Sequence, residues 1–349
     1  MAYTTIDDPS AHFQVTLYTG DGNDDRNLTN DGNSDLQPDF LWDKRRSTTG
    51  SHKLIDSNRG VTKPLSTNNT NAEGSESNAV QAFQTDGFQV GNDSNINGNG
   101  VTYVAWQWKA NGGTTASNSN GSITSTVQAN TTAGFSIVTF TGNTTAGATV
   151  GHGLGVAPDY VQVRRFDRSG DAWRGFWSPL GNEKYLELNA TDAQQDSTTG
   201  AWNDTSPTSS VFSLGSAAGI NGGSMIAYCF ASIPGYSKIG SYFGNGNADG
   251  PFVYTGFKPA WLMIKVFNGN TGGWDMYDNK RGSYNGQISM LQANASASEA
   301  TSDGVDFLSN GFKIRHTSGN QNGNGNSHVY LAFAEHPFVS SKGVPVTAR

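Results

Sequence analysis

Two polar loops carry residue types that bind calcium. The stretches Asp21–Arg26 and Asn245–Gly250 place carboxylate or amide oxygens at alternate positions, and calcium prefers oxygen ligands of this kind. Arg26 stands where an EF-hand loop requires glycine, and neither loop supplies the bidentate glutamate. A structural calcium site is therefore one interpretation of these loops, and a polar hairpin tip is the other. The candidate ligands are Asp21, Asn23, Asp25, Asn245, Asn247 and Asp249.

The remaining residue patterns do not indicate catalysis. The sequence has no G-x-S-x-G nucleophile elbow, and its six histidines form no H-x-x-x-H or H-E-x-x-H pair. Cys229 is the single cysteine, so there is no Cys/His cluster for zinc, and its apolar neighbours predict a buried small hydrophobe. Residues 151–155 resemble half of a nucleotide-binding loop, but no βαβ pattern surrounds them, so His152 is interpreted as a hairpin residue. We therefore predict no catalytic residue, no cofactor beyond the calcium alternative, and no enzymatic activity.

Two carboxylates occur at matching places in the sequence. Asp56 precedes Arg59-Gly60, and Asp278 precedes Arg281-Gly282. Glycoside cleavage requires two carboxyl groups in a specific spatial arrangement, whereas duplication of one pattern favours a structural turn that satisfies backbone groups. A third copy has Ser178–Gly181 instead, without the charges.

The elements that would position these residues occur three times. Pro38, Pro158 and Pro259 mark equivalent points, with spacings of about 120 and then about 100 residues. Each copy is thus the size of a domain and not a short solenoid repeat. The clearest copies are LQPDFLWDKRR (36–46), VAPDYVQVRRF (156–166) and FKPAWLMIKVF (257–267). A further set of equivalent small residues is predicted at Ala105, Ala227 and Ala332.

The local patterns are typical of β-structure. Short alternating or wholly apolar runs are separated by Gly-rich turns, and Asp86-Gly87 and Asn310-Gly311 favour tight hairpins. Aromatic residues make up 11% of the chain and charged residues only 15%, which argues for buried cores and against disorder. We predict an all-β fold of tandem β-sandwich modules, jelly-roll-like in form. Their equivalent central strands would be Phe40–Trp42, Tyr160–Val163 and Trp261–Ile264.

The sequence predicts six segments. They are an N-terminal arm (1–12), β-sandwich module 1 (13–110), a linker rich in Gly, Ser, Thr and Asn (111–133), module 2 (134–233), module 3 (234–338) and a C-terminal tail (339–349). The linker composition is that of a flexible or extended connector. The arm is too short to form a core, so we expect it to be mobile until it docks on another surface.

Charge and hydropathy exclude several classes of partner. The net charge of −7 disfavours a nucleic-acid or anionic-membrane surface. The densest basic cluster, Lys44-Arg45-Arg46, is interpreted as the end of a strand. No run approaches 18 apolar residues, and the first residues lack the features of a signal peptide, which indicates synthesis in a cytoplasm without membrane insertion.

Several motifs together carry a family resemblance. They are AYTTIDDPSAHFQVTLYTGDG, LQPDFLWDKRR, VAWQWKA, GHGLGVAPDYVQVRR, DNKRG and the terminal AEHPFVSSKGVPVTAR. In content and order they resemble a family of repeat-containing virion proteins of marine tailed bacteriophages, described as structural, tail-fibre-like or capsid-associated. The resemblance implies a non-enzymatic virion component that is assembled in the host cytoplasm and associates with other virion proteins.

Three roles are compatible with this resemblance. The leading one is a surface-exposed appendage of tail-fibre type that contacts the host surface. The second is a head decoration protein or head fibre bound to the capsid lattice, and the third is a carbohydrate-cleaving tailspike. Because exposed strand edges must be paired or covered, we also expect a homo-oligomer, possibly a trimer.

Polar loops are the expected contact with a host-surface glycan. Asn and Asp side chains can pair with sugar hydroxyls, and loops on a rigid scaffold tolerate variation. The candidate loops are Asp21–Asp35, Asn92–Gly100, Asn245–Gly250 and Asn320–Asn326.

Overall fold

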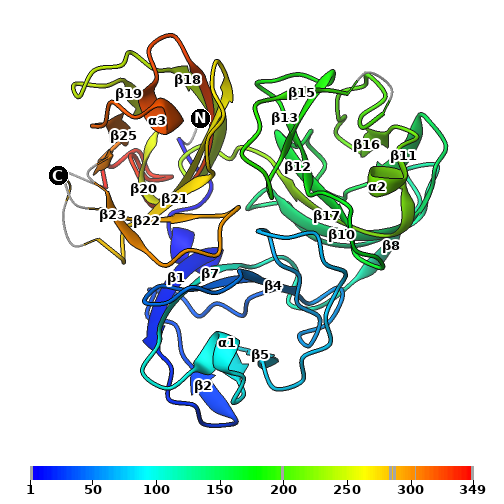
Figure 1. Ribbon diagram of the computed structural model, residues 1–349, viewed down its shortest axis with the longest axis horizontal. Coiled ribbons are helices and arrows are strands. Elements are labelled where there is room, and N and C mark those ends of the chain that lie inside the picture. The colour runs from blue at the N-terminus through cyan, green and yellow to red at the C-terminus, as the bar shows by residue number, and fades with distance from the viewer. Residues whose placement is uncertain (1–2, 198–199, 283–284, 286–287, 303, 347–349) are drawn as a thin grey trace.

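Three β-sandwiches stand around a common centre (Figure 1). The computed structural model describes residues 3–197, 200–282, 285, 288–302 and 304–346. The predicted all-β sandwich fold is confirmed, since antiparallel sheets dominate every part of the described chain. The helices are single turns: η1 (Pro9–Ala11), α1 (Ser94–Asn97), α2 (Ala218–Asn221) and α3 (Gly319–Asn322).

Module 1 shows the pattern that the other two modules share. Its larger sheet has the order β1 (Phe13–Thr19), β7 (Thr102–Trp108), β3 (Phe40–Arg45) and β4 (Lys53–Asp56). Its smaller sheet has the order β2 (Arg26–Leu28), β6 (Gly87–Val90) and β5 (Val80–Gln84). The first strand thus pairs with the last and the second with the next to last, so that the chain is rolled on itself as in a jelly roll. The third and fourth strands depart from that form, because they pair as a simple hairpin.

Modules 2 and 3 repeat this order with added strands in the larger sheet, and the smaller sheet of module 2 has two strands instead of three. The larger sheet of module 2 runs β15 (Gln195–Asp196), β14 (Lys184–Glu187), β13 (Arg174–Trp177), β12 (Tyr160–Arg165), β17 (Gly222–Phe230), β10 (Phe135–Asn143), β9 (Ser125–Asn130) and β8 (Ala116–Asn118), and the smaller one pairs β11 (Ala148–Gly151) with β16 (Val211–Leu214). The larger sheet of module 3 runs β18 (Ser237–Phe243), β26 (Ser327–Pro337), β20 (Phe257–Asn268), β21 (Asp275–Asp278), β22 (Ile288–Gln292) and β23 (Ala300–Ser302), and the smaller one β19 (Phe252–Tyr254), β25 (Gly311–Ile314) and β24 (Val305–Leu308).

Strand register makes the three modules directly comparable. Two residues after each repeated proline, the central strand pairs with an aromatic residue of the closing strand. These pairs are Phe40 with Trp108, Tyr160 with Phe230, and Trp261 with Phe333. The three predicted central strands therefore lie at the same place in their sheets.

The predicted equivalence of the three alanines is wrong in one case. Ala105 and Ala227 lie three residues before Trp108 and Phe230, but Ala332 lies one residue before Phe333. Residues two apart in a strand share a face. A shift of two residues therefore preserves the apolar pattern, and the sequence could not detect it.

The predicted connector, residues 111–133, is a part of the second sandwich. Its strands β8 and β9 extend the sheet beyond β10, with Val127 paired to Val138, and Ile123 bridges to Val150 of β11. The flexible-linker interpretation is therefore wrong for this segment. An edge strand needs few apolar anchors, and Ile123 and Val127, both buried, are sufficient for it.

The N-terminal arm is packed against module 3, contrary to the expected mobility. Ile6 is buried, and the Tyr3 hydroxyl donates to the Gly256 carbonyl at 2.8 Å. Asp7 accepts a hydrogen bond from the Ser341 backbone N–H at 2.7 Å, which joins the arm to the tail. The arm thus finds its docking surface within its own chain. Residues 1–2 of the arm and 347–349 of the tail lie outside the described residues.

A core of large aromatic side chains joins all three modules. It is distinct from the smaller clusters inside each sandwich. Its largest members are Phe13, Phe40, Trp42, Trp106, Trp108, Phe135, Tyr160, Trp173, Trp177, Tyr228, Phe230, Tyr236, Trp261, Trp274 and Phe333. Because the inner face of every larger sheet contributes to this cluster, the three modules close into a ring around it.

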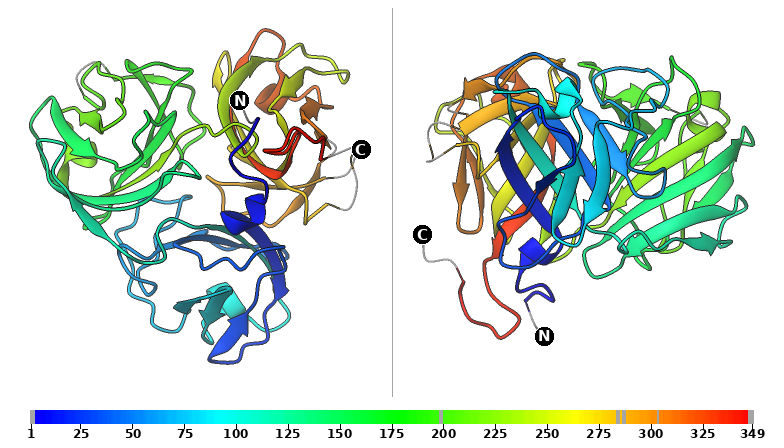
Figure 2. Two further views of the ribbon diagram at one scale, coloured as in Figure 1. Left: turned by 180° about the vertical axis from the view of Figure 1, so that it is seen from behind. Right: turned by 90° about the horizontal axis from the view of Figure 1, so that it is seen from below.

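The ring has two different faces. The helices α1, α2 and α3 lie toward the viewer in Figure 1. The arm, drawn in dark blue, lies toward the viewer from the opposite side, and both termini emerge together on that side (Figure 2). We call these the loop face and the terminal face.

Candidate functional site

The three seams between modules are built from equivalent contacts. In each seam an aromatic side-chain N–H at one position of the repeat meets a backbone carbonyl of the preceding module, where module 3 precedes module 1 around the ring. Trp173 Nε1 donates to Ser66 O at 2.8 Å, and Trp274 Nε1 donates to Glu187 O at 3.0 Å. His52 Nε2 lies 2.9 Å from Gln292 O.

His52 serves as a neutral hydrogen-bonding group. Its Nδ1 accepts from Trp42 Nε1 at 2.8 Å, so Nε2 carries the proton and donates to Gln292 O. Burial lowers the pKa of His52 to about 3. The Nε2–H group of His52 therefore matches the indole N–H of Trp173 and Trp274 in chemistry as well as in position.

A buried cation crosses each seam. In each central strand the residue four positions after Phe40, Tyr160 or Trp261 is basic and fully buried. These residues are Lys44, Arg164 and Lys265. Lys44 Nζ donates to Ala297 O, Arg164 Nη2 to Asn71 O and Lys265 Nζ to Thr191 O, each at 2.8 Å. Burial lowers the pKa of Lys44 and Lys265 to about 8. Lys44 ends β3 together with Arg45, in agreement with the predicted strand end.

The loops that receive these cations also repeat. One asparagine in each loop accepts, through Oδ1, a hydrogen bond from a backbone N–H. The pairs are Asn68 with His52 at 2.9 Å, Asn189 with Trp173 at 2.8 Å and Asn294 with Trp274 at 2.8 Å. Sequence reasoning missed this role. The signal that could have found it is the recurrence of an Asn-x-Ser/Thr triplet at one place in every copy.

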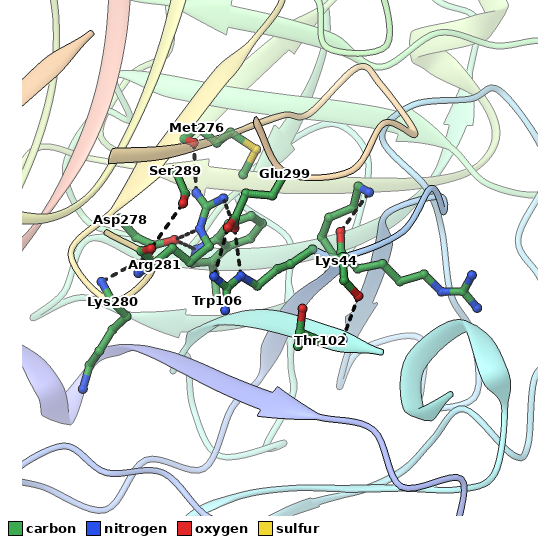
Figure 3. A network of polar contacts seen from close by, with 12 residues as sticks. Lys44, Thr102, Trp106, Met276, Asp278, Lys280, Arg281, Ser289 and Glu299 are labelled. Carbon is green, nitrogen blue, oxygen red and sulfur yellow. Dashed lines mark hydrogen bonds and ion pairs between the residues drawn. The ribbon is translucent and has the colours of Figure 1, made fainter. Parts of the chain in front are cut away.

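Asp278 and Arg281 form the centre of a polar network in the 3–1 seam (Figure 3). Arg281 Nε lies 2.5 Å from Asp278 Oδ2, and both side chains are inaccessible to solvent. Trp106 Nε1 of module 1 donates to the same Oδ2 at 3.0 Å. Glu299 accepts from Arg281 at 3.3 Å and from Arg46 of module 1 at 2.8 Å.

Asp56 and Arg59 repeat this network in the 1–2 seam. Arg59 Nε lies 2.7 Å from Asp56 Oδ2, and the Tyr228 hydroxyl of module 2 donates to that oxygen at 2.7 Å. Each aspartate also accepts from the backbone N–H of its arginine at 2.9 Å. This is the predicted structural turn, and the contact across the seam adds a second role that the sequence did not reveal.

The 2–3 seam has apolar residues in place of this ion pair. The position of Asp56 and Asp278 is occupied by Trp177, and that of the arginines by Leu180. The Trp177 ring stacks on Trp274 of module 3 with the centroids 5.6 Å apart. The chain thus contains two polar versions and one apolar version of the same joint.

A buried asparagine closes each single-turn helix on the loop face. Asn97, Asn221 and Asn322 are the last residues of α1, α2 and α3 and are fully buried. Their Nδ2 groups donate to the loop that follows the first strand, to Asn23 O at 2.8 Å, Thr145 O at 2.9 Å and Asn247 O at 2.7 Å. We call this contact the asparagine lock.

A Gly-Asx pair is the sequence signature of the lock. Gly20-Asp21 and Gly244-Asn245 directly follow β1 and β18, and Gly142-Asn143 are the last two residues of β10. A Cβ atom at Gly20 would lie 2.2 Å from Gly98 O, and one at Gly244 would lie 2.3 Å from Gly323 O. Only glycine therefore allows the helix to approach so closely.

Four of the six calcium candidates lie in two of these locks, Asp21 and Asn23 in module 1 and Asn245 and Asn247 in module 3. Asp21 Oδ1 accepts from the N–H of Asn23 at 2.9 Å and from Asn97 Nδ2 at 3.1 Å. The counterpart Asn245 Oδ1 accepts from the N–H of Asn247 at 3.0 Å and from Asn322 Nδ2 at 3.1 Å. These oxygens are used to shape their own loops. Among the described residues, no three His, Cys, Asp or Glu side chains gather in a way that could hold a metal ion.

The last two candidates are placed differently. Asp249 Oδ1 pairs with Lys313 Nζ at 2.7 Å, and this ion pair lowers the pKa of the carboxyl group. Asp25 adopts a left-handed backbone conformation with φ of 55° at the loop tip.

We predict that the asparagine lock is essential for loop structure. Replacing Asn322 by Ala removes the Nδ2 donor and the Oδ1 acceptor. Their buried backbone partners are then left without a hydrogen bond. The expected loss is about 2–4 kcal/mol of unfolding free energy, measured by urea denaturation. N97A and N221A should behave alike, whereas N324A, an exposed residue two positions further, should change little. A loss no larger than that of N324A would contradict the lock.

The remaining candidates for reactivity are internal. Cys229 is buried, and burial raises the pKa of its thiol to about 12. His152 Nδ1 accepts from the N–H of Leu154 at 3.2 Å, in keeping with a hairpin residue. Throughout the described ranges, no helix has the length and apolar character needed to span a membrane.

The fold and its seams define an all-β protein of three fused sandwiches. Residues 8–337 match the family described as Domain of unknown function (DUF7483), and the chain belongs to that family. The match extends from the arm to the end of β26, so the family unit is the complete ring and not a single module. No curated protein matches the chain, and no solved structure matches it.

Proposed function

We propose that this protein is a non-enzymatic structural component of a phage virion, a surface-exposed appendage of tail-fibre type that contacts the host. The observation that supports this proposal most directly is the arrangement of the ring, with both termini on one face and the repeated loops on the other (Figures 1 and 2). Such an arrangement allows the terminal face to bind other virion proteins while the loop face remains open to a host surface.

The interior chemistry supports a structural role. The buried charges of Lys44, Asp56, Arg164, Lys265 and Asp278 all join modules or shape turns. A buried charge requires paired or hydrogen-bonded partners. These groups therefore act in assembly of the ring, and the proposal needs no catalytic residue or cofactor.

Rigid loops support the host-contact role. The structure brings the four predicted recognition loops together in pairs. Asp21–Asp35 meets Asn92–Gly100 through Asn97, and Asn245–Gly250 meets Asn320–Asn326 through Asn322. The inner amides are occupied, which leaves exposed side chains such as Asn99 and Asn324 for a glycan. Binding by such a prearranged loop avoids the entropy cost of ordering it.

The location on the virion is tested by labelling. Gold-labelled antibody fragments raised against the folded protein should mark the tail in electron micrographs of the particles. Labelling of the head would instead support the alternative, a head decoration protein or head fibre. Particles that lack the protein altogether would overturn both.

Host contact is tested separately with purified protein. N99A and N324A, alone and combined, should reduce binding to host cells at least tenfold, with an unchanged circular dichroism spectrum. A matched exposed change on the terminal face, V344A, should leave binding unaltered. Release of reducing sugar from host envelope would favour the third role, a carbohydrate-cleaving tailspike, and would contradict the proposed lack of enzymatic activity.

A further inference from the structure

A cavity of about 320 Å³ lies beside the linker that joins modules 2 and 3. Its walls are formed by residues between 232 and 239, from the linker and the start of β18, by residues 254–256 at the end of β19, and by Tyr3 of the arm. Sites for small molecules have volumes of roughly 300–1,000 Å³. The cavity therefore has room for a small ligand, of about the size of one or two rings.

Two exposed aromatic residues of β19 mark this side of module 3. Phe252 and Tyr254 lie on the same face of the strand and are 45% and 48% exposed, and Tyr254 also lines the cavity. The pairing of the smaller sheets shows what stands at the same places in the other modules. These residues are Asn27 and Thr29 in module 1, and Thr149 and Gly151 in module 2. The fold thus does not require aromatic residues here, and exposed rings beside a cavity are typical of a binding site.

The hydroxyl groups of the cavity leave both a donor and an acceptor open. The Tyr3 hydroxyl gives its single proton to Gly256 O at 2.8 Å, so the Tyr254 hydroxyl, 2.9 Å away, donates to Tyr3 and keeps its own lone pairs for a ligand. Ser232 Oγ accepts from the N–H of Ile239 at 3.1 Å, and among the described contacts its own proton has no acceptor. Sugar hydroxyls both donate and accept, so they match this pair of groups.

Lys238 gives the cavity a positive charge. Among its described lining residues Lys238 alone is charged, and none is Asp or Glu. Lys238 Nζ donates to Tyr254 O at 2.8 Å and lies 5.5 Å from the centre of the Tyr254 ring. An ammonium group has three N–H donors, so two remain for a ligand. Burial lowers the pKa of Lys238, and a bound anion would stabilise its charged form.

We infer that this cavity binds an acidic saccharide. One sugar ring contacts the Tyr254 ring, its hydroxyl groups bond to Tyr254 Oη and Ser232 Oγ, and its carboxylate or phosphate pairs with Lys238. Phe252 extends the aromatic surface beyond the cavity for a neighbouring ring. An apolar side chain of another protein would leave these polar groups buried without partners. The site is separate from Asn99 and Asn324, so the inference stands without the host contact proposed for the loop face.

The test is binding of the full chain to uronic-acid oligosaccharides and to sugar phosphates, each beside its neutral counterpart. Titration calorimetry should show an acidic probe binding at least tenfold more tightly than its neutral counterpart, or by about 1.4 kcal/mol, and the probe class that binds identifies the anion. K238M should remove this preference. Y254T copies Thr29 of module 1 and should weaken binding at least tenfold, with an unchanged circular dichroism spectrum.

K63M is the matched control, since Lys63 lies in module 1 and outside the cavity. It should leave the affinity unchanged, as should N99A/N324A, which separates this site from the loop face. The absence of binding by every acidic probe would overturn the inference. So would an acidic preference that survives K238M, or an equal loss of affinity in K63M or in N99A/N324A.

Discussion

A chain of residues 13–110 expressed alone is expected to be unfolded, although the sequence marks it as a complete module. Its aromatic residues pack on the other modules. Phe13 stacks on Phe333 with the centroids 5.2 Å apart, and Phe40 contacts Tyr228 at 4.4 Å. Exposing several such side chains costs about 1.5–3 kcal/mol each. The total is comparable with the roughly 5–15 kcal/mol that stabilises a whole domain.

The measurement is the amide NMR spectrum of this fragment, with the full chain as the control. We expect collapsed peak dispersion for the fragment and a single cooperative thermal transition for the full chain. A well-dispersed spectrum of residues 13–110, or three separate transitions in the full chain, would show that the modules are independent domains.

The arm belongs to the same cooperative unit. Because Ile6 lies in the shared core and Tyr3 binds Gly256, deletion of residues 1–12 should lower the stability of the whole ring. This replaces the expectation from sequence that the arm is mobile until it docks on another surface.

Local patterns were sufficient for the sandwich fold and its three central strands. The repeated proline, the buried strand after it and the Gly-containing turns predicted three sandwiches with equivalent central strands. The hairpins at Asp86-Gly87 and Asn310-Gly311 are present, with Gln84 paired to Gly87 and Leu308 to Gly311. These features depend on neighbours close in sequence, which alternation and turn chemistry report directly.

The seams could not be predicted in the same way. Trp106 and Asp278 are 172 residues apart, and His52 shares a role with two tryptophans that it does not resemble in sequence. One equivalent position is occupied by Lys44, Arg164 and Lys265 in modules 1, 2 and 3. Another is occupied by Asp56, Trp177 and Asp278. Only the register of the strands shows that these residues correspond. The asparagine lock was not predicted in the calcium-candidate loops for a related reason, because Asn97 lies 76 residues from Asp21 in the sequence.

Replacing Asp278 by Ala is expected to cost about 3–5 kcal/mol of unfolding free energy. The change leaves Arg281 buried without its nearest carboxylate, and breaking a buried ion pair from one side has a cost of this size. It also removes the acceptor of Trp106 Nε1. The control is D31A in the same seam. Asp31 pairs with Lys280 at 2.9 Å in a solvent-exposed position, so a change of roughly 0–1 kcal/mol is expected.

The apolar 2–3 seam predicts how the loss can be recovered. In the double variant D278L/R281L both charges are absent, as they are at Trp177 and Leu180, so no charged group is left buried without its partner, although the N–H groups of Trp106 and Arg281 lose their acceptor. Replacing a whole buried pair by apolar residues is often neutral or stabilising. The double variant should therefore be at least about 2 kcal/mol more stable than D278A in urea denaturation. Simple addition of the losses of D278L and R281L would mean that the two residues act independently and would contradict the stabilising role of the buried pair.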